Sequence, residues 1–86
     1  MARYNIYLRK SAAKELEGIP RRELRRIVQR IRSLATNPRP PGCEKPTAQE
    51  LYRIRQGDYR VVYSVQDSER SVWIVKIGHR REVYRP

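Results

Sequence analysis

Three arginines beside a predicted turn could bind a phosphodiester. Arg53, Arg55 and Arg60 flank Gly57–Asp58, a dipeptide that suits a two-residue turn between two short strands. With that turn, Arg55 lies opposite Arg60, and the three guanidinium groups share one sheet face. Like charges directly across a strand pair are destabilising, so a small fold tolerates them best where they have a function. Because the planar guanidinium matches phosphate oxygens, a phosphodiester is the natural ligand.

The strand that follows can extend this cluster, although its register is ambiguous by one residue. We favour the register that leaves Lys76 outward and directs Arg80 toward Arg60. The side chains expected in the core are then Trp73, Val75 and Ile77.

Each candidate also has a simpler structural explanation. The arginines between residues 21 and 32 are expected either to be solvated or to contact a nucleic-acid backbone. Taken alone, His79 is more often incidental than catalytic, and Tyr84 is more often a packing residue near a chain end. Cys43 is the single cysteine, which excludes an intramolecular disulfide, and with one histidine a zinc site is not expected. No metal or cofactor is therefore predicted.

The charge balance points to an anionic partner. The 86 residues include 20 Lys and Arg against 9 Asp and Glu, giving a net charge of +11 and a pI near 10.7. Nucleic acid is the first expectation, an acidic protein the second and an anionic membrane a distant third. The sequence contains no signal-peptide pattern and no apolar run of membrane-spanning length, so a cytoplasmic protein without a membrane partner is expected.

The elements that must position these residues follow from hydrophobic periodicity. Period-two alternation predicts strands over 3–8, 51–56, 59–66 and 71–78, with a second turn at 67–70 and a last extended piece over 82–84. Ser11 is expected to cap a helix that ends at Gly18, with Ala12, Ala13 and Leu16 inward. Pro20 is expected in the first turn of a second helix, whose apolar stripe runs from Leu24 to Ala35.

This order predicts a single α+β domain over residues 1–86. An N-terminal strand precedes a two-helix hairpin and an antiparallel β-meander. Both amphipathic helices need the same sheet face to bury their stripes, so the opposite face is expected to be free.

Two stretches resemble a known family. The segment from Tyr52 to Tyr63 resembles the central hairpin of the RelE/ParE toxin superfamily. The segment Ile77-Gly78-His79-Arg80-Arg81-Glu82-Val83-Tyr84 looks like the C-terminal signature of the RelE branch, and it favours RelE over the gyrase-targeting ParE branch. Together with the preceding strand and helices, the resemblance covers essentially the whole chain and implies a RelE-like fold.

Similarity to RelE implies the toxin of a type II toxin–antitoxin system, which enters the ribosomal A site and cleaves messenger RNA by attack of the ribose 2′-hydroxyl, without a metal. By position, Arg60 and Arg80 would hold the phosphate, and Tyr84 would stack on the substrate or exchange a proton with it. The residues expected to bind substrate are Arg53, Arg55, Lys76 and Arg81.

One departure from the family bears on proton transfer. Family members often carry lysine at the positions of Arg53 and Arg55, and arginine cannot give up its proton in a protein. Both residues are therefore expected to act as electrostatic stabilisers. His79 is the side chain suited to act as the base at neutral pH, because imidazole changes its charge in the physiological range.

The resemblance also implies partners: an acidic cognate antitoxin, the ribosome and its message, and operator DNA for the complex with the antitoxin. Three alternatives stay open. They are a ParE-like inhibitor of DNA gyrase, a non-catalytic RNA- or ribosome-binding module, and a toxin that has lost catalysis.

Overall fold

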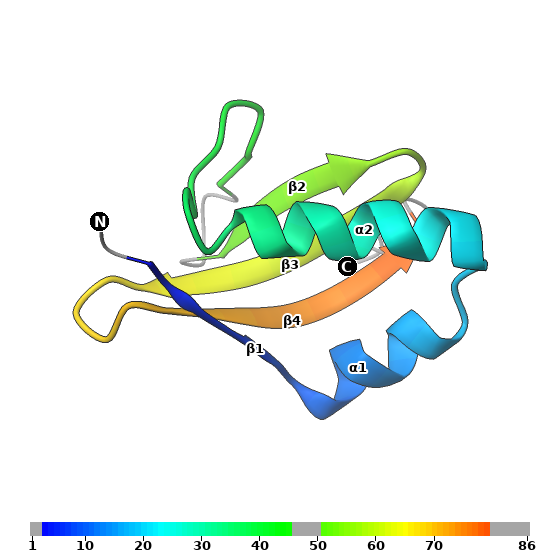
Figure 1. Cartoon of the computed structure of the whole chain (residues 1–86), viewed down its shortest axis with the longest axis horizontal. Helices are drawn as coiled ribbons and strands as arrows, with labels where there is room; N and C mark the ends of the chain where they lie inside the picture. The colour runs from blue at the N-terminus through cyan, green and yellow to red at the C-terminus, as the bar shows by residue number, and fades with distance from the viewer. Residues whose placement is uncertain (1–2, 46–50, 80–86) are drawn as a thin grey trace.

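The computed structural model describes residues 3–45 and 51–79 and has two layers (Figure 1). A four-stranded sheet carries two helices on one face, which confirms the predicted α+β class. The elements are β1 Asn5–Leu8, α1 Lys10–Glu17, α2 Arg21–Ser33, β2 Tyr52–Gln56, β3 Tyr59–Gln66 and β4 Ser71–His79. In the described part of the chain, no helix is long and apolar enough to cross a membrane.

The sheet has the strand order β1-β4-β3-β2. Strands β2, β3 and β4 form the predicted antiparallel meander. The first strand joins at the far edge, where it pairs with β4 in parallel. The long crossover that a parallel pair requires is provided by the helices and the meander. Both ends of the described chain are thereby tied into one sheet.

The core lies between α2 and the sheet. Ile27 and Ile31 face inward from α2, and Tyr63 is the largest of the fully buried side chains. The other core members, from the helices, the connections and the strands, are Ala12, Ile19, Leu34, Ile54, Val61, Val72, Ile74 and Ile77. Since removing a buried isoleucine side chain costs about 2–5 kcal/mol, this one cluster contributes most of the stability of so small a fold.

The turn between β2 and β3 forms where it was expected. Gly57 has a φ of +60°, which a residue without a Cβ adopts freely, and Gln56 pairs with Tyr59. A positive φ at the first central residue alone is the pattern of a type II′ turn, whose twist matches that of the strands. The register of the hairpin therefore follows directly from its turn.

A β-bulge makes the predicted register of β4 wrong for two of its three residues. Val62 pairs with Lys76 but Tyr63 pairs with Ile74, so Val75 is the extra residue on β4. Before the bulge, Val72 and Ile74 face the core and Trp73 does not. After the bulge, Ile77 faces the core, as expected, because the inserted residue reverses the alternation.

The first helix differs in detail from its prediction. It begins at Lys10 after an Arg9 N-cap, and Ser11 makes no capping bond. The Ser11 hydroxyl instead donates to the carbonyl of Val75 at 3.5 Å, and Ala13 is exposed rather than inward. The predicted end at Gly18 is confirmed. Pro20 stands at the N-cap of α2, one position before the helix itself.

Side chains of α1 protect the edge of β4 beyond the end of β1. The last pair between these strands is Leu8 with Ile74, so the later part of β4 has no strand on this side and is paired only with β3. Oε1 of Glu15 accepts a hydrogen bond of 2.9 Å from the amide of Ile77, and Oε2 accepts one of 3.2 Å from Nζ of Lys76. Glu15 thus replaces a missing strand partner.

A second cluster fixes the chain between α2 and β2. Arg39 forms a two-pronged ion pair with Asp67, at 2.8 and 3.1 Å, and its Nε donates to the hydroxyl of Tyr52. Tyr4 also donates to Asp67, at 2.7 Å. The hydrogen bonds from Arg39 and Tyr4 lower the pKa of Asp67 to about 2. The carboxylate joins three segments that are distant in sequence.

Candidate nucleic-acid interface

The hairpin of β2 and β3 places the predicted arginines on the face opposite the helices. Arg55 lies directly across from Arg60, as the turn predicted. Arg53 is opposite Val62 on the same face, and Lys76 is the partner of Val62 on the other side. Four cationic side chains therefore project from three neighbouring strands on one side of the sheet.

These four side chains differ in their access to solvent. Arg55 and Lys76 are exposed, whereas the side chain of Arg53 is 19% exposed, with its Nε 3.4 Å from Oε1 of Glu44. Arg60 is only 4% exposed, so the expectation of an open position is wrong for this residue. Arg60 lies on β3, an inner strand, between Arg55 of β2 and Gly78 of β4. Arg55, on the edge strand β2, is exposed to solvent.

The structure places His79 on the other side of the sheet. Tyr59 pairs with His79, and the next pair is Arg60 with Gly78. Because successive pairs point to opposite faces, His79 and Arg60 diverge. The expectation that His79 lies beside the arginines is therefore wrong. The rings of His79 and Tyr59 meet edge to face, with centroids 5.8 Å apart.

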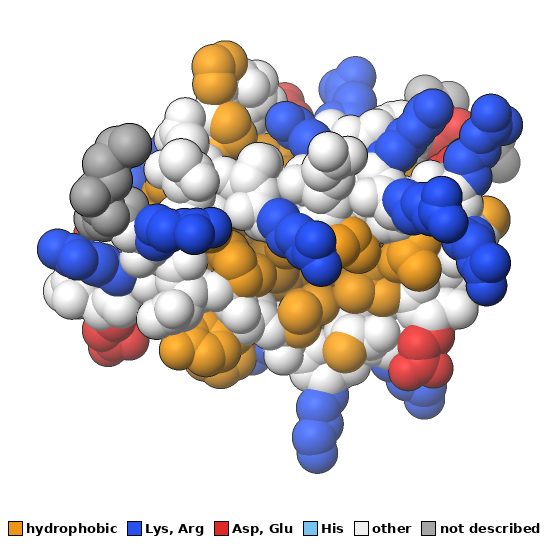
Figure 2. All heavy atoms as spheres, in the orientation of Figure 1, with side chains coloured by type: hydrophobic (Ala, Val, Ile, Leu, Met, Phe, Trp, Pro, Cys, Tyr) orange, Lys and Arg blue, Asp and Glu red, His pale blue; other side chains and the backbone are white. Residues whose placement is uncertain are grey.

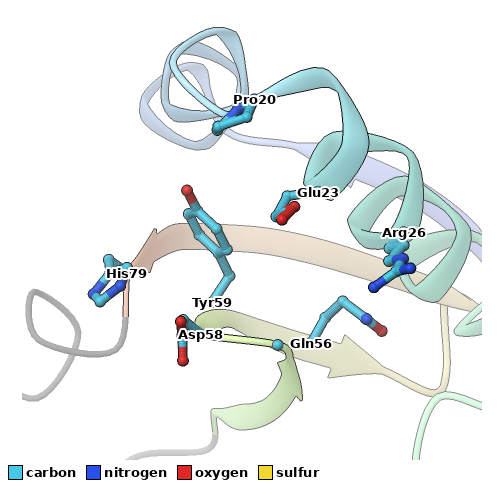
Figure 3. A pocket seen from close by; sticks show the side chains of 8 residues that line it. Pro20, Glu23, Arg26, Gln56, Asp58, Tyr59 and His79 are labelled. Carbon is cyan, nitrogen blue, oxygen red and sulfur yellow. The ribbon is translucent and has the colours of Figure 1, made fainter.

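His79 and Tyr59 instead line a cavity on the helix side. In Figure 3 the ring of Tyr59 points toward Pro20 and Glu23, and His79 lies beside it at the end of β4. The cavity has a volume of about 310 Å³. Its lining mixes charges: Glu23 and Asp58 are acidic and Arg26 is basic. Oε2 of Glu23 is buried and has no hydrogen-bond partner among the described residues.

Three of the predicted site residues, Arg80, Arg81 and Tyr84, lie outside the described residues. The last described position, His79, ends β4 at the same end of the sheet as Arg55 and Arg60.

A second basic surface covers α2. Arginines of this helix are exposed along its outer side, and Figure 2 shows a row of basic side chains that follows the helix. The exposed members are Arg21, Arg22, Arg25, Arg26 and Arg32. They point away from the sheet, so the molecule presents cations on both of its broad sides.

Comparison with known proteins places the chain in a family. The model of the ParE toxin of type II toxin–antitoxin systems matches residues 6–84, which include every predicted site residue. The chain belongs to the RelE/ParE toxin superfamily. It is thus a toxin of the type II toxin–antitoxin class, as the two sequence motifs indicated, and the arginine hairpin is part of the matched region.

Several curated relatives of this chain are RelE toxins. The toxin RelE of Mycobacterium tuberculosis is 33% identical over 86 residues and covers 95% of this chain and 87% of its own. The toxin RelG of the same organism is 30% identical, with 95% and 97% covered. The structure of the archaeal RelE–RelB complex from Pyrococcus horikoshii contains a chain that is 31% identical, with a TM-score of 0.78 and coverage of 93% and 97%.

Sequence reasoning missed two features of the site. The role of Glu15 could not be predicted, because the edge of β4 that it protects is open only where the short strand β1 ends. Tyr7 and Trp73 stack with centroids 4.8 Å apart, and Trp73 had been expected in the core. The outward position of Trp73 could have been predicted from the alternative register of β4, which places Trp73 on the helix-free face.

Proposed function

We propose that this chain is a ribosome-dependent endoribonuclease that cleaves messenger RNA in the A site. The observation that carries the proposal is the cross-strand pair of Arg55 and Arg60, flanked by Arg53 and Lys76 on the helix-free face. Concentrating cations there lowers the stability of a fold of this size. The negative charge of a phosphodiester, which increases in the transition state of cleavage, would offset that repulsion.

The proposed chemistry needs no metal. The 2′-hydroxyl loses its proton and attacks the adjacent phosphorus, the bond to the 5′-oxygen breaks, and a 2′,3′-cyclic phosphate and a 5′-hydroxyl are left. Arg60 and Arg80 would hold the phosphate while negative charge builds on its oxygens. Arg53, Arg55, Lys76 and Arg81 would bind the neighbouring backbone. Because Arg60 is 4% exposed, its contact with a phosphate requires a local opening of the site.

The position of His79 changes the proposed route of the proton. A general base must come within hydrogen-bond reach of the hydroxyl that it deprotonates. His79 faces the helix side with Tyr59, away from Arg55. We therefore assign proton exchange to Tyr84 or to the ribosome, and we give His79 a positioning role at the end of β4.

The proposed partners follow from charge and family. A net charge of +11 suits both ribosomal RNA and an acidic antitoxin. The Pyrococcus relative was solved in complex with RelB. We propose that an acidic antitoxin binds this chain in the cytoplasm, partly folds on binding, and forms with it a complex that can bind operator DNA.

One observation favours a second candidate function. The family model that matches residues 6–84 describes the ParE toxin, whose branch targets DNA gyrase. A ParE-like function would leave messages intact and block supercoiling. A non-catalytic ribosome-binding module would bind without either effect.

The test is addition of the purified protein to a translating extract, with mapping of message 5′ ends. The proposal predicts codon-phased cuts within translated regions, and no cuts when translation initiation is blocked. A parallel supercoiling assay with DNA gyrase separates the alternatives. Intact messages together with inhibited supercoiling would replace the proposal by the gyrase function.

A further inference from the structure

The helix-free face of the sheet has a second half that the proposed cleavage site does not use. Beyond the arginine pair, Tyr7 of β1 and Trp73 of β4 are direct register partners. Their rings are stacked, with centroids 4.8 Å apart and an interplanar angle of 23°. The side chain of Tyr7 is 43% exposed, although it is large and aromatic. The stack is therefore open to solvent on the Tyr7 side, whereas Trp73 is partly buried.

Trp73 of the stack lines a hollow of about 710 Å³ whose other lining residues are mainly polar or charged. Arg9 and Lys10 contribute two cations and Glu69 one carboxylate. Ser64 and Gln66 add hydroxyl and amide groups from β3. Aromatic rings beside cations and hydrogen-bonding side chains are the combination that binds single-stranded nucleic acid, because every base has a face that can stack.

The β-bulge joins this hollow to the arginine half of the face. Trp73 and Lys76 are three residues apart, so a regular strand would send them to opposite sides. The extra residue Val75 brings both to the helix-free face. Bulges recur beside functional sites because they redirect a side chain. Along β3, Ser64 opposite Trp73 is four residues, about 13 Å, from Arg60.

We propose that the Tyr7–Trp73 stack is a platform for unpaired bases of the single-stranded RNA whose phosphate the arginines hold. The inference rests on the proposed function, because it extends the path of the same RNA across the same face. The stack supplies affinity without base preference, and Arg9 and Lys10 bind the backbone beside it.

The surroundings favour RNA over a protein partner. A large contiguous apolar patch on a surface marks a site for a protein partner. Among the described residues, Tyr7 and Leu8 are the exposed large hydrophobic side chains. The remaining lining is polar or charged, and the face continues into four cations rather than into apolar surface.

Trp73 makes the inference directly measurable, because it is the single tryptophan of the chain. A short single-stranded oligouridine is titrated into the wild-type protein, and tryptophan fluorescence is recorded. Stacking of a base on the Tyr7–Trp73 pair predicts saturable quenching. Inorganic polyphosphate is the control that carries the charge without bases, and it is expected to bind without comparable quenching.

A matched pair of variants separates the ring from its hydroxyl. Tyr7→Ala should weaken binding of oligouridine by about fivefold or more, since stacking on an aromatic side chain contributes at least that factor per base. Tyr7→Phe should bind as the wild type does. Both substitutions are at an exposed position of an edge strand, and Trp73 remains as the reporter. If Tyr7→Ala fails to fold, Trp73→Phe is tested with a labelled oligouridine. The smaller ring should then bind the oligouridine more weakly than the wild type does.

Three results would overturn the inference: equal quenching by polyphosphate, no quenching at saturating oligouridine, or wild-type RNA affinity in Tyr7→Ala. If Tyr7→Ala keeps wild-type RNA affinity but no longer binds the acidic protein encoded beside the gene, the stack is a binding site for the antitoxin instead. The translating extract distinguishes the two proposals. Codon-phased cuts without quenching would support the proposed cleavage and refute the base-stacking platform. Quenching without cuts would support the platform and refute the proposed cleavage.

Discussion

Tyr63 combines a fully buried ring with a hydrogen bond to the backbone. Its hydroxyl donates to the carbonyl of Pro38 at 2.7 Å, which fixes the start of the connection to β2. Burial raises the pKa of this phenol well above its ordinary value, so the hydroxyl stays a donor at any physiological pH.

Tyr63→Phe should lower the free energy of unfolding by about 1–2 kcal/mol, because the ring is kept and the carbonyl loses its donor. Urea unfolding followed by tryptophan fluorescence measures the change, with an unchanged m-value. Tyr52→Phe is a useful comparison, since its half-buried hydroxyl accepts from Arg39 at a more exposed position. An unfolding midpoint equal to that of the wild type would show that the Pro38 contact contributes nothing.

The direction of the His79 side chain leads to a prediction about catalysis. His79→Gln should retain message cleavage within a few fold, because the imidazole lies with Tyr59 on the helix side. Tyr84→Phe should reduce cleavage by about a hundredfold, the usual scale for a lost proton-transfer group. Single-turnover cleavage on programmed ribosomes gives both rates. The reverse order of effects would return the role of base to His79.

The arginine pair shows how far residue positions could be predicted. Gly57–Asp58 fixes the register of the hairpin, so the opposition of Arg55 and Arg60 followed from sequence. Burial of Arg60 did not, because strand alternation gives the face on which a side chain lies but not how far that side chain is covered. The predicted roles of Arg80, Arg81 and Tyr84 remain predictions, since these residues lie outside the described part of the chain.

At the scale of elements, β4 was the hardest to predict. Its alternation is interrupted by a bulge at Val75, and valine fits a regular strand as well as a bulged one. Neither simple register is right along the whole strand: one places Val72 and Ile74 inward, the other Ile77. The second helix, by contrast, followed from periodicity, because the stripe from Leu24 to Ala35 fits only one face.

Glu15 links α1 to β4, and its removal should loosen that edge. Glu15→Ala should lower the free energy of unfolding by about 1–3 kcal/mol, because the amide of Ile77 loses a charged acceptor. Glu15→Gln keeps an acceptor oxygen and should lose less. Hydrogen exchange at the amide of Ile77 should accelerate in the alanine variant. Equal stability of the alanine and glutamine variants would contradict this role.

For the whole molecule, Asp67 connects the N-terminus, the connection after α2 and the turn before β4. Its pKa is lowered to about 2 by hydrogen bonds from Arg39 and Tyr4, so the folded state binds this proton more weakly than the unfolded state. The resulting stabilisation is fully present above the ordinary pKa of 3.8 and is lost as the pH falls toward 2.

Asp67→Asn should therefore lower stability at neutral pH and flatten the acid dependence between about pH 4 and pH 2. Thermal unfolding across this range measures the effect, and the wild type and the variant should converge at the acid end. Parallel curves, with a constant difference at all pH values, would show that the carboxylate contributes no proton linkage.

The charge distribution of the whole molecule makes its central claim testable with two arginines. Arg55 and Arg32 are both exposed, but Arg55 lies on the helix-free face and Arg32 lies on α2, beyond the other face. Changing either one to glutamine removes the same charge, so general attraction to RNA falls equally in both variants.

Codon-phased message cleavage by Arg55→Gln and Arg32→Gln, measured side by side on translating ribosomes, tests the helix-free face most directly. Loss of a charge-assisted contact to the RNA backbone beside the reacting phosphate predicts a decrease of about tenfold or more for Arg55→Gln. Cleavage by Arg32→Gln is expected to stay within about twofold of the wild type, since it removes one distant surface charge. Equal rates in the two variants, or a larger loss at Arg32, would contradict the assignment of the cleavage site to the face that carries Arg55 and Arg60.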